Sequence, residues 1–347
     1  MINVGLVGLG FMGMIHYLAY QRMRGVRVVA MCEKDQTRLS GDWRSIKGNF
    51  GPAGTMMDLS GIARYTDLDQ MLAESKLDMI DVCLPPWLHA PMAIAGLEAG
   101  KHVFCEKPIA LHPADAERMV NTAKRAGKLL AIGHVLPFAP PYKFVHEAVV
   151  GGRYGRLLGG CFKRVISDPL WLPDFYNPDT TGGPMIDLFI HDTHFVRLLC
   201  GMPSAVNTAG TLHDKVLERF TTQFIFDDPA LTVTGISGVI GQQGRPFTNA
   251  FEVYLEKATL LFDFAVIGNE GVTVMPLTVL DHRGKVVRPK LAAGDDIDPF
   301  KEEIGEVLRA IRTGKPSPLL GGDLARDALV LCQRQTESAV KKRRAAV

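Results

Sequence analysis

VGLVGLGFMG, residues 4–13, decides how the first part of this chain folds. Its glycines Gly8, Gly10 and Gly13 have the spacing GxGxxG, with an apolar strand-like run before them and helical spacing in FMGMIHYLAY after them. In that setting the first glycine permits a tight turn, the second lets a pyrophosphate approach the backbone, and the third lets helix and strand pack closely. The pattern therefore predicts a dinucleotide-binding turn, and glycines kept only for packing are the weaker alternative.

The next strand-like run, VRVVAMCE, ends in Glu33, which follows Gly13 by 20 residues. A carboxylate at this position is placed to bond a ribose hydroxyl, and it would repel a 2'-phosphate. This predicts NAD in preference to NADP. Lys34 and Arg38 lie close by in the sequence, and their positive charges weaken this preference for NAD, so NADP stays a possible cofactor.

Strand-like and helical stretches alternate through the first 130 or so residues. The strand-like runs are 2–10, 26–33, 79–86, 101–108 and 128–134, and the helical stretches are 11–23, 68–73, 90–99 and 114–126. Apolar strands separated by helices indicate parallel strands with crossovers, hence a doubly wound sheet. We therefore assign residues 1–133 to a Rossmann domain that binds NAD or NADP.

The texture changes after residue 134. Residues 167–184 are rich in Pro, Asp, Asn, Thr and Gly and predict an irregular loop, which a single helix follows from about 185 to 199. Later strand-like pieces separated by turns, such as 219–228, 231–240 and 251–264, predict an antiparallel sheet. Two more helices are expected near 299–312 and 324–340. We assign residues 134–347 to a second α/β domain that binds substrate and mediates oligomerisation.

Composition narrows the class of protein. The chain has 347 residues, 47% of them hydrophobic, which suits two domains with large cores. Lys and Arg number 39 against 37 Asp and Glu, so no global field favours nucleic acid or an anionic membrane. Six scattered cysteines without a CxxC pair indicate a reducing compartment, and no signal peptide or long apolar span is apparent. We expect a cytoplasmic protein.

One connection is unusually long. Residues 40–62, which include GNFGPAG, separate the second strand from the next predicted helix. Loops of this length are often functional or mobile. We expect this one to extend toward the adenosine end of the cofactor or toward a neighbouring subunit.

A second group of polar residues lies in KHVFCEKP. It places Glu106 and Lys107 at the carboxyl end of a strand, where ligands bind in open α/β sheets. Pro108 restricts the backbone of Lys107 and so fixes the direction of its side chain. A lone lysine at a strand end is more often a solvated charge, so its meaning depends on its context.

That context resembles a known family. The stretches GLGFMG, VAMCE, DVCLPPWLHAPMAIAGLEAGKHVFCEKPIAL and GGPMIDLFIHDTHFVRLLCG together resemble the Gfo/Idh/MocA oxidoreductases. The resemblance is dense from residue 2 to about 134, recurs at 182–201 and is faint over the later strands. It implies a Rossmann domain that holds NAD(H) or NADP(H), a second domain with an open, mostly antiparallel sheet, and activity on sugars or cyclitols.

The resemblance also implies site residues. Lys107 matches the lysine of the family's EKP motif, Asp187 the aspartate of the second-domain motif and His191 the histidine four residues later, and these three form the catalytic set in inositol-dehydrogenase-like members. The candidate cofactor-binding residues are Gly8, Gly10, Phe11, Met12, Gly13, Glu33, Lys34, Pro85, His89, Glu106 and Lys107. The sequence departs from the family at Pro86, where Asn is common, at His194, where Asp is common, and in the long 40–62 loop.

Three readings of the helix at 185–199 stay open. Asp187, His191 and His194 have i, i+4 and i+7 spacing and so share one face of a single helix. That face suits proton transfer by a histidine that a carboxylate orients, a facial metal triad, or a structural polar stripe. A nicotinamide cofactor favours proton transfer, because hydride transfer needs a base for the alcohol proton and no metal. We therefore assign no metal ligands.

These observations predict an NAD(P)-dependent dehydrogenase acting on the CH–OH group of a sugar, sugar derivative or cyclitol. The alternatives are a non-catalytic or regulatory nucleotide-binding protein on the same scaffold, or a metal-dependent enzyme centred on the 187/191/194 face. The expected partner is a small polyol, with no nucleic acid and no membrane. The apolar strands after residue 201 further predict a sheet face left open in the monomer, hence a homodimer or homotetramer.

Overall fold

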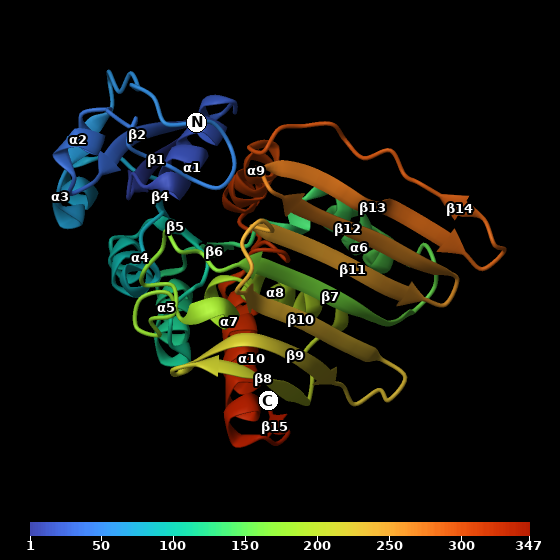
Figure 1. The fold of residues 1–347 in the computed structure, drawn as a ribbon. Coiled ribbons are helices and arrows are strands. Elements are labelled where there is room, and N and C mark those ends of the chain that lie inside the picture. Colours follow the sequence, from blue (N-terminus) through green and yellow to red (C-terminus); the bar gives the residue numbers. More distant parts are fainter. The chain divides into compact units, whose positions relative to one another are not determined.

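The computed structural model describes residues 1–347, which form two compact units (Figure 1). Unit 1 comprises Met1–Phe138 and Ala293–Arg326, and unit 2 comprises Ala139–Ala292 and Asp327–Val347. The two units differ from the predicted domains, which had a single boundary near residue 134, because the segment Ala293–Arg326 belongs to unit 1. None of the helices combines the length and the apolar character needed to cross a membrane.

Unit 1 is built on a parallel sheet of six strands. The strand order is β3-β2-β1-β4-β5-β6, the order of dinucleotide-binding sheets. The strands are β1 (Ile2–Val7), β2 (Val26–Cys32), β3 (Ala63–Tyr65), β4 (Met79–Val82), β5 (His102–Glu106) and β6 (Leu130–Gly133). The predicted Rossmann domain is confirmed. The three-residue β3 was not predicted, because it is too short to carry a periodic pattern.

Helices cross over between these strands. They are α1 (Phe11–Gln21), α2 (Gln36–Leu39), α3 (Leu68–Glu74), α4 (His89–Glu98) and α5 (Pro113–Ala126), with 3-10 turns η1 (Pro86–Leu88) and η2 (Leu136–Phe138). Local chemistry sets their ends: Asp67 caps α3 by accepting the Gln70 N–H, and Gly127, with φ 61°, ends α5 in the left-handed region. The predicted helices are confirmed within a few residues, and α2 is additional.

Helix α9 (Asp298–Thr313) explains why the late segment belongs to unit 1. Phe300, Ile304, Val307 and Leu308 recur at helical spacing and are all buried in a core that includes Ile15 of α1. Burying such a stripe is worth roughly 2 kcal/mol for each large side chain. The opposite face of α9 is largely charged, as its amphipathic pattern requires.

The 40–62 loop is a packed part of unit 1. Trp43 is fully buried, its ring lies against Tyr17 of α1 at a centroid distance of 5.2 Å, and its Nε1 donates to the carbonyl of Arg38. Ile46 and Leu59 share the same core cluster. The loop therefore folds back onto α1 of its own unit.

Unit 2 contains a sheet of nine strands in the order β14-β13-β12-β11-β7-β10-β9-β8-β15. Only β7 and β10 run parallel, so the predicted mostly antiparallel sheet is confirmed. The strands are β7 (Leu157–Ser167), β8 (Ala205–His213), β9 (Val216–Ile225), β10 (Thr232–Ile240), β11 (Phe247–Leu255), β12 (Ala258–Ile267), β13 (Glu270–Asp281), β14 (Val286–Val287) and β15 (Ala345–Ala346). Strand β7 was not predicted, and β11 and β12 were expected as one strand.

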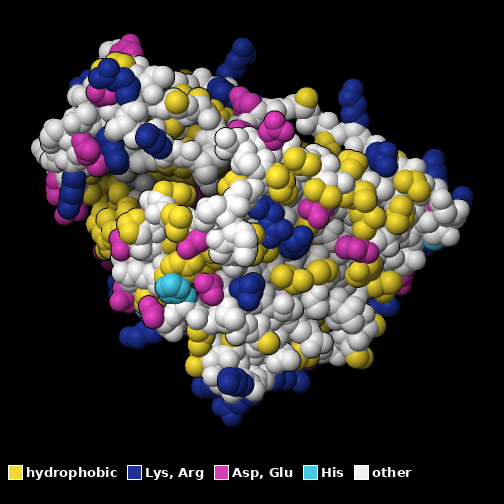
Figure 2. All heavy atoms as spheres, in the orientation of Figure 1, with side chains coloured by type: hydrophobic (Ala, Val, Ile, Leu, Met, Phe, Trp, Pro, Cys, Tyr) yellow, Lys and Arg dark blue, Asp and Glu magenta, His cyan; other side chains and the backbone are white.

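One face of this sheet carries helices and the other does not. The covered face carries α6 (Pro140–Val150) (Figure 1). Tyr142 of α6 packs against Phe251 and Phe195, with ring centroids 5.1 and 5.2 Å away. Every second side chain of a strand points to the other face. Several of these side chains are apolar and exposed: Ile236, Tyr254, Ile267, Val272, Met275 and Leu280. Figure 2 shows hydrophobic groups mixed with charges across the sheet.

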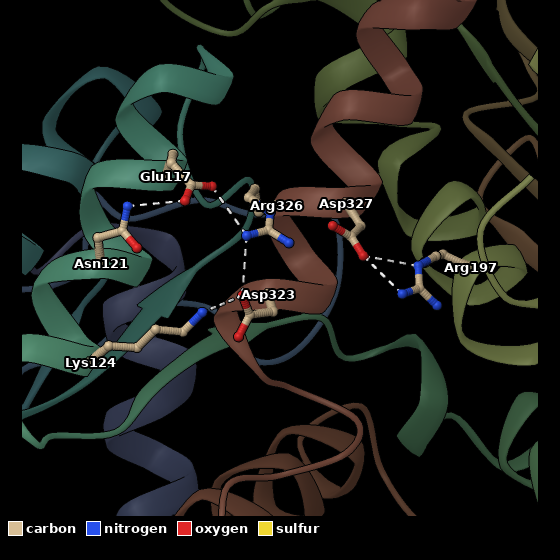
Figure 3. Close-up of polar contacts among 7 residues, drawn as sticks. All are labelled: Glu117, Asn121, Lys124, Arg197, Asp323, Arg326 and Asp327. Atoms are coloured by element: carbon tan, nitrogen blue, oxygen red, sulfur yellow. Dashed lines mark hydrogen bonds and ion pairs between the residues drawn. The ribbon is translucent and has the colours of Figure 1, made fainter. Parts of the chain in front are cut away.

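The last long helix, α10 (Gly322–Lys341), is divided between the units after Arg326. In unit 1, Arg326 pairs with Glu117 of α5 at 3.1 Å, and Asp323 accepts from Lys124 at 3.1 Å (Figure 3). In unit 2, Asp327 accepts two hydrogen bonds from the Arg197 guanidinium, at 2.8 and 3.0 Å. Successive turns of one helix are thus anchored in both units.

Candidate functional site

The glycine-rich turn has the geometry that its spacing predicts. Gly8 has φ +92°, and a Cβ there would lie 2.6 Å from the carbonyl oxygen of Cys83. A Cβ on Gly13 would lie 2.1 Å from the carbonyl oxygen of Gly8, whereas a Cβ on Gly10 would meet nothing within 4 Å. Gly8 and Gly13 therefore permit close packing, and Gly10 leaves open space at the start of α1, where backbone N–H groups favour an anion.

Glu33 lies just after β2 and is tied to this turn. Its carboxylate accepts the Leu9 N–H at 2.7 Å and the Asp35 N–H at 3.0 Å, and its side chain is partly accessible. A carboxylate oxygen has further lone pairs, so these bonds leave room for a ribose hydroxyl. Lys34, next in the chain, is exposed.

Two other candidates surround the turn. Phe11, the first residue of α1, packs edge-to-face against Phe50 of the 40–62 loop at a centroid distance of 4.8 Å. Met12 follows it and is partly buried against the core. The 40–62 loop thus supports the residue next to Gly10.

Pro85 and His89 follow β4. His89 is only 1% exposed, and its ring nitrogens lie 2.6 Å from the Pro108 carbonyl and 2.7 Å from the Leu84 carbonyl. Burial lowers the pKa of this histidine, although the two carbonyls oppose the shift. His89 therefore lies beneath the loops after β4 and β5 and links them, whereas Pro85 belongs to the loop itself.

Lys107 follows β5, as predicted, and Glu106 is the last residue of that strand. The side chain of Glu106 is turned into the core: it is 6% exposed and accepts the Lys107 N–H at 3.1 Å. Its other oxygen lies 3.1 Å from Nε2 of His16, a residue of α1 that the sequence analysis did not select. The signal that pointed to His16 was a polar residue inside the apolar run of α1.

In unit 2, the expected helix at 185–199 is two helices. Helix α7 (Gly183–Asp187) and helix α8 (Ile190–Cys200) are separated at Leu188 and Phe189. Gly182 and Gly183 start α7 with φ values of 77° and 71°, and a Cβ on either would lie 2.6–2.8 Å from a neighbouring side chain. The motif therefore needs both glycines to direct α7.

This break changes how the three polar residues of the motif lie. Asp187 ends α7 and is partly exposed, as is His191 in the first turn of α8, whereas His194 is fully buried. The expected single helix with Asp187, His191 and His194 on one face is therefore wrong. Asp187 and His191 are partly exposed, and His194 belongs to the interior of unit 2.

A buried ion pair holds α8 next to His191. Asp192, which is fully buried, accepts from the guanidinium of Arg164 on β7, itself 4% exposed and lying over the Phe247 ring at 5.5 Å. Burial opposes the charge, but Asp192 outweighs it and raises the pKa of Arg164, so the guanidinium stays charged. The pair fixes the first turn of α8, from which the His191 side chain extends.

Two family models match the chain. Residues 2–134 match an oxidoreductase family with an NAD-binding Rossmann fold, and residues 142–261 match the GFO/IDH/MocA C-terminal domain. Together they cover most of the chain and confirm the resemblance seen in the sequence.

Individual proteins agree with this match. The chain is 26% identical over 353 aligned residues to a myo-inositol 2-dehydrogenase of Thermotoga maritima, covering 99% of this chain and 97% of that protein. An oxidoreductase of Agrobacterium radiobacter in complex with NAD+, L-tartaric acid and magnesium superposes with a TM-score of 0.80 at 17% identity, covering 99% and 98%. A levoglucosan dehydrogenase in complex with NADH and levoglucosan gives 0.79 at 20%, covering 100% and 99%.

The residues present fit a bound dinucleotide. The space at Gly10, the helix N-terminus behind it and the carboxylate of Glu33 are the three features that hold a pyrophosphate and a ribose. A side chain at position 10 would fill the space a phosphate needs.

Alanine substitutions at Gly10 and Gly13 should have different effects, the first on NAD binding and the second on stability. Gly10→Ala should leave stability almost unchanged and weaken NAD binding by about tenfold or more, because its Cβ enters the phosphate space. Gly13→Ala should destabilise unit 1 by about 1–3 kcal/mol, because overpacking against Gly8 outweighs the roughly 1 kcal/mol gain in helix propensity. Calorimetric titration and urea unfolding measure the two effects.

Gly305→Ala is the matched control. Gly305 lies in α9, and a Cβ there would come no closer than 3.9 Å to Met23. This variant should keep NAD affinity and gain up to about 1 kcal/mol of stability. Equal stability losses in the Gly10 and Gly13 variants would contradict the assignment.

Proposed function

We propose, since the chain belongs to the GFO/IDH/MocA family of NAD-dependent oxidoreductases, that its substrate is a sugar, a sugar derivative or a cyclitol with a secondary alcohol or the matching ketone. The open cradle at Gly10 carries the cofactor part of this proposal. The myo-inositol 2-dehydrogenase that matches along nearly its whole length, and the neighbour crystallised with levoglucosan, support the substrate class.

Nicotinamide, when bound, supplies the hydride acceptor or donor. The protein must supply the group that accepts or donates the hydroxyl proton of the substrate. Oxidising an alcohol requires a base within hydrogen-bond reach of its hydroxyl and a donor that steadies the developing alkoxide. We assign the base to His191, its orientation to Asp187 and the donor to Lys107. The partial exposure of Asp187 and His191 supports the first two roles, and the family resemblance supports all three.

The carboxylate of Glu33 should set the choice of cofactor. NAD is expected to bind more tightly than NADP, because the carboxylate attracts a ribose hydroxyl and repels a 2'-phosphate. Glu33→Ala should weaken NAD by about tenfold, which corresponds to the loss of one charged hydrogen bond, and should narrow the gap to NADP. Fluorescence titration with both nucleotides measures this.

Lys34→Ala serves as the matched control, because this exposed neighbour bears the opposite charge. It should leave NAD affinity nearly unchanged. Tighter binding of NADP than of NAD by the unmodified protein would show that Lys34 or Arg38, rather than Glu33, governs the choice.

The base assignment gives a kinetic prediction. With a substrate found by screening polyols and sugars for NADH formation, His191→Asn should lower kcat by roughly a hundredfold or more, because proton removal loses its acceptor. NAD affinity and thermal unfolding should stay as in the unmodified protein. His282→Asn, at an exposed histidine in a hairpin turn, is the control and should keep full turnover.

Three results would sink this assignment. Near-full turnover in His191→Asn would remove its role as the base. Loss of activity with a chelator, restored by zinc or iron, would indicate a metal-dependent enzyme. NAD binding without turnover of any substrate in the panel would indicate a binding protein on this scaffold.

We also propose that the uncovered sheet face of unit 2 joins copies of the chain into a dimer or tetramer. Exposed apolar side chains such as Ile236 and Tyr254 support this, because contiguous apolar patches on a soluble protein usually mark association surfaces. The cytoplasm is the proposed location, since all six cysteines are free in the structure.

Ile236→Asp combined with Tyr254→Asp should shift the mass in sedimentation or light scattering toward the monomer, because two charges would be buried at the interface. Val150→Asp, at a 71% exposed valine at the end of α6, should leave the mass unchanged. A monomeric mass for the unmodified protein at micromolar concentration would refute the oligomer.

A further inference from the structure

A fully buried polar cluster lies in unit 1 beneath the end of β5. At its centre is His16 of α1, with no exposed surface. Its Nδ1 lies 2.9 Å from Oδ2 of Asp81 on β4, and its Nε2 lies 3.1 Å from Oε1 of Glu106. Tyr20, one turn further along α1, donates its hydroxyl to the same Asp81 oxygen at 2.8 Å. The histidine thus bridges the ends of two neighbouring strands.

Two further groups face the histidine. The Cys83 thiol lies 3.3 Å from Nδ1 of His16. The buried carboxyl of Glu303 on α9 has an oxygen within 4.8 Å of a ring nitrogen of His16 and of a carboxylate oxygen of Glu106. Burial and the charge of Glu106 raise the pKa of Glu303 well above its usual value, which favours the neutral form of its carboxyl.

The surroundings of His16 favour a proton on each of its ring nitrogens. Burial alone would lower its pKa, but the charge and hydrogen bond of Asp81, with a contribution from Cys83, raise it well above the usual 6.5. An imidazolium donates to two acceptors at once, which is what carboxylate oxygens at 2.9 and 3.1 Å require. Asp81, His16 and Glu106 thus form a row of side chains at hydrogen-bond distance, with the imidazole in the middle.

The row ends on the backbone of Lys107. While Oε1 of Glu106 faces His16, its Oε2 accepts the Lys107 N–H at 3.1 Å. Both oxygens of one buried carboxylate are therefore used, one by the cation and one by the residue after the strand. Because charge-assisted hydrogen bonds are roughly twice as strong as neutral ones, this fixes the start of the loop more firmly than a backbone bond would.

We propose that Glu106 is a positioning residue for Lys107, with the His16 ring holding the side chain of Glu106 and that side chain holding the Lys107 backbone. The proposal rests on the proposed function, in which Lys107 is the donor. It assigns Glu106 a role in aiming a catalytic side chain, whereas the sequence analysis expected it to contact the cofactor. The position of a catalytic side chain matters, since a misplacement of about 1 Å can lower a reaction rate about a hundredfold.

A double-mutant cycle tests this role. Glu106→Gln has the same shape, but its single carbonyl oxygen cannot accept from both His16 and Lys107. It should lower kcat by about tenfold or more while changing NAD affinity and KM by less than about threefold. In a Lys107→Ala background, the same substitution should cost less than about twofold, because there is no longer an ammonium to aim. Glu98→Gln, an exposed glutamate at the end of α4, is the control for turnover.

The outcomes separate the two proposals. An equal loss from Glu106→Gln in both backgrounds, or no loss in either, would overturn the positioning role while leaving the donor role intact. Full turnover in Lys107→Ala alone would overturn the proposed donor, and the positioning role with it. Loss of turnover in Lys107→Ala, together with a non-additive loss in the double variant, supports both.

The unmodified protein offers a test that needs no variant. Histidine-selective nitrogen-15 NMR should show an imidazolium that keeps both ring protons at about pH 8, when an ordinary histidine is neutral. His102 and His146 should not give this signal, because burial lowers their pKa values. If every histidine is neutral at that pH, or if a stoichiometric divalent metal occupies the cluster, the proposal is overturned.

Discussion

The close approach of α1 to the ends of β1 and β4 is the constraint on which the rest of unit 1 depends. It exists only because Gly8 and Gly13 lack a Cβ; a methyl group at Gly13 would overlap the Gly8 carbonyl at 2.1 Å. At this separation the start of α1 borders the open space at Gly10, and His16, five residues further along the same helix, reaches Asp81 and Glu106 at hydrogen-bond distance. The glycines therefore set both the open space at the turn and the contacts of the buried histidine.

A buried acid next to a candidate catalytic residue occurs in each unit. In unit 1, Glu106 precedes Lys107 and is paired with His16; in unit 2, Asp192 follows His191 and is paired with Arg164. An unpaired buried carboxylate would lower the free energy of unfolding by several kcal/mol, so each acid keeps its partner. The backbone next to each acid therefore has little freedom to move. Both candidate catalytic residues are thereby adjacent in the chain to a buried, paired acid in the core.

The sequence predicts best where one period dominates. The apolar runs of β1, β2, β4, β5 and β6 specify the parallel sheet, and GxGxxG with Glu33 specifies its cofactor turn. Strand β7 and helix α6 were missed, because one has glycines and charged residues inside it and the other begins with two prolines. The break between α7 and α8 leaves no breaker residue in the sequence, since Leu188 and Phe189 are both apolar. Tertiary packing decides these features.

Buried charge is the part of the site that sequence reasoning finds hardest, although it leaves a trace. Glu303 falls on the same stripe of α9 as Phe300 and Ile304, and His16 falls within the apolar run of α1, so each breaks the pattern of a core-facing helix. Such a break costs stability unless partners from other elements satisfy it. Those partners, Asp81 and Glu106, lie 65 and 90 residues from His16 along the chain. No local pattern joins them; the parallel order of β4 and β5 brings them to one edge of the sheet. A polar residue on an otherwise apolar helix face is therefore a reason to examine the strand ends that the helix covers.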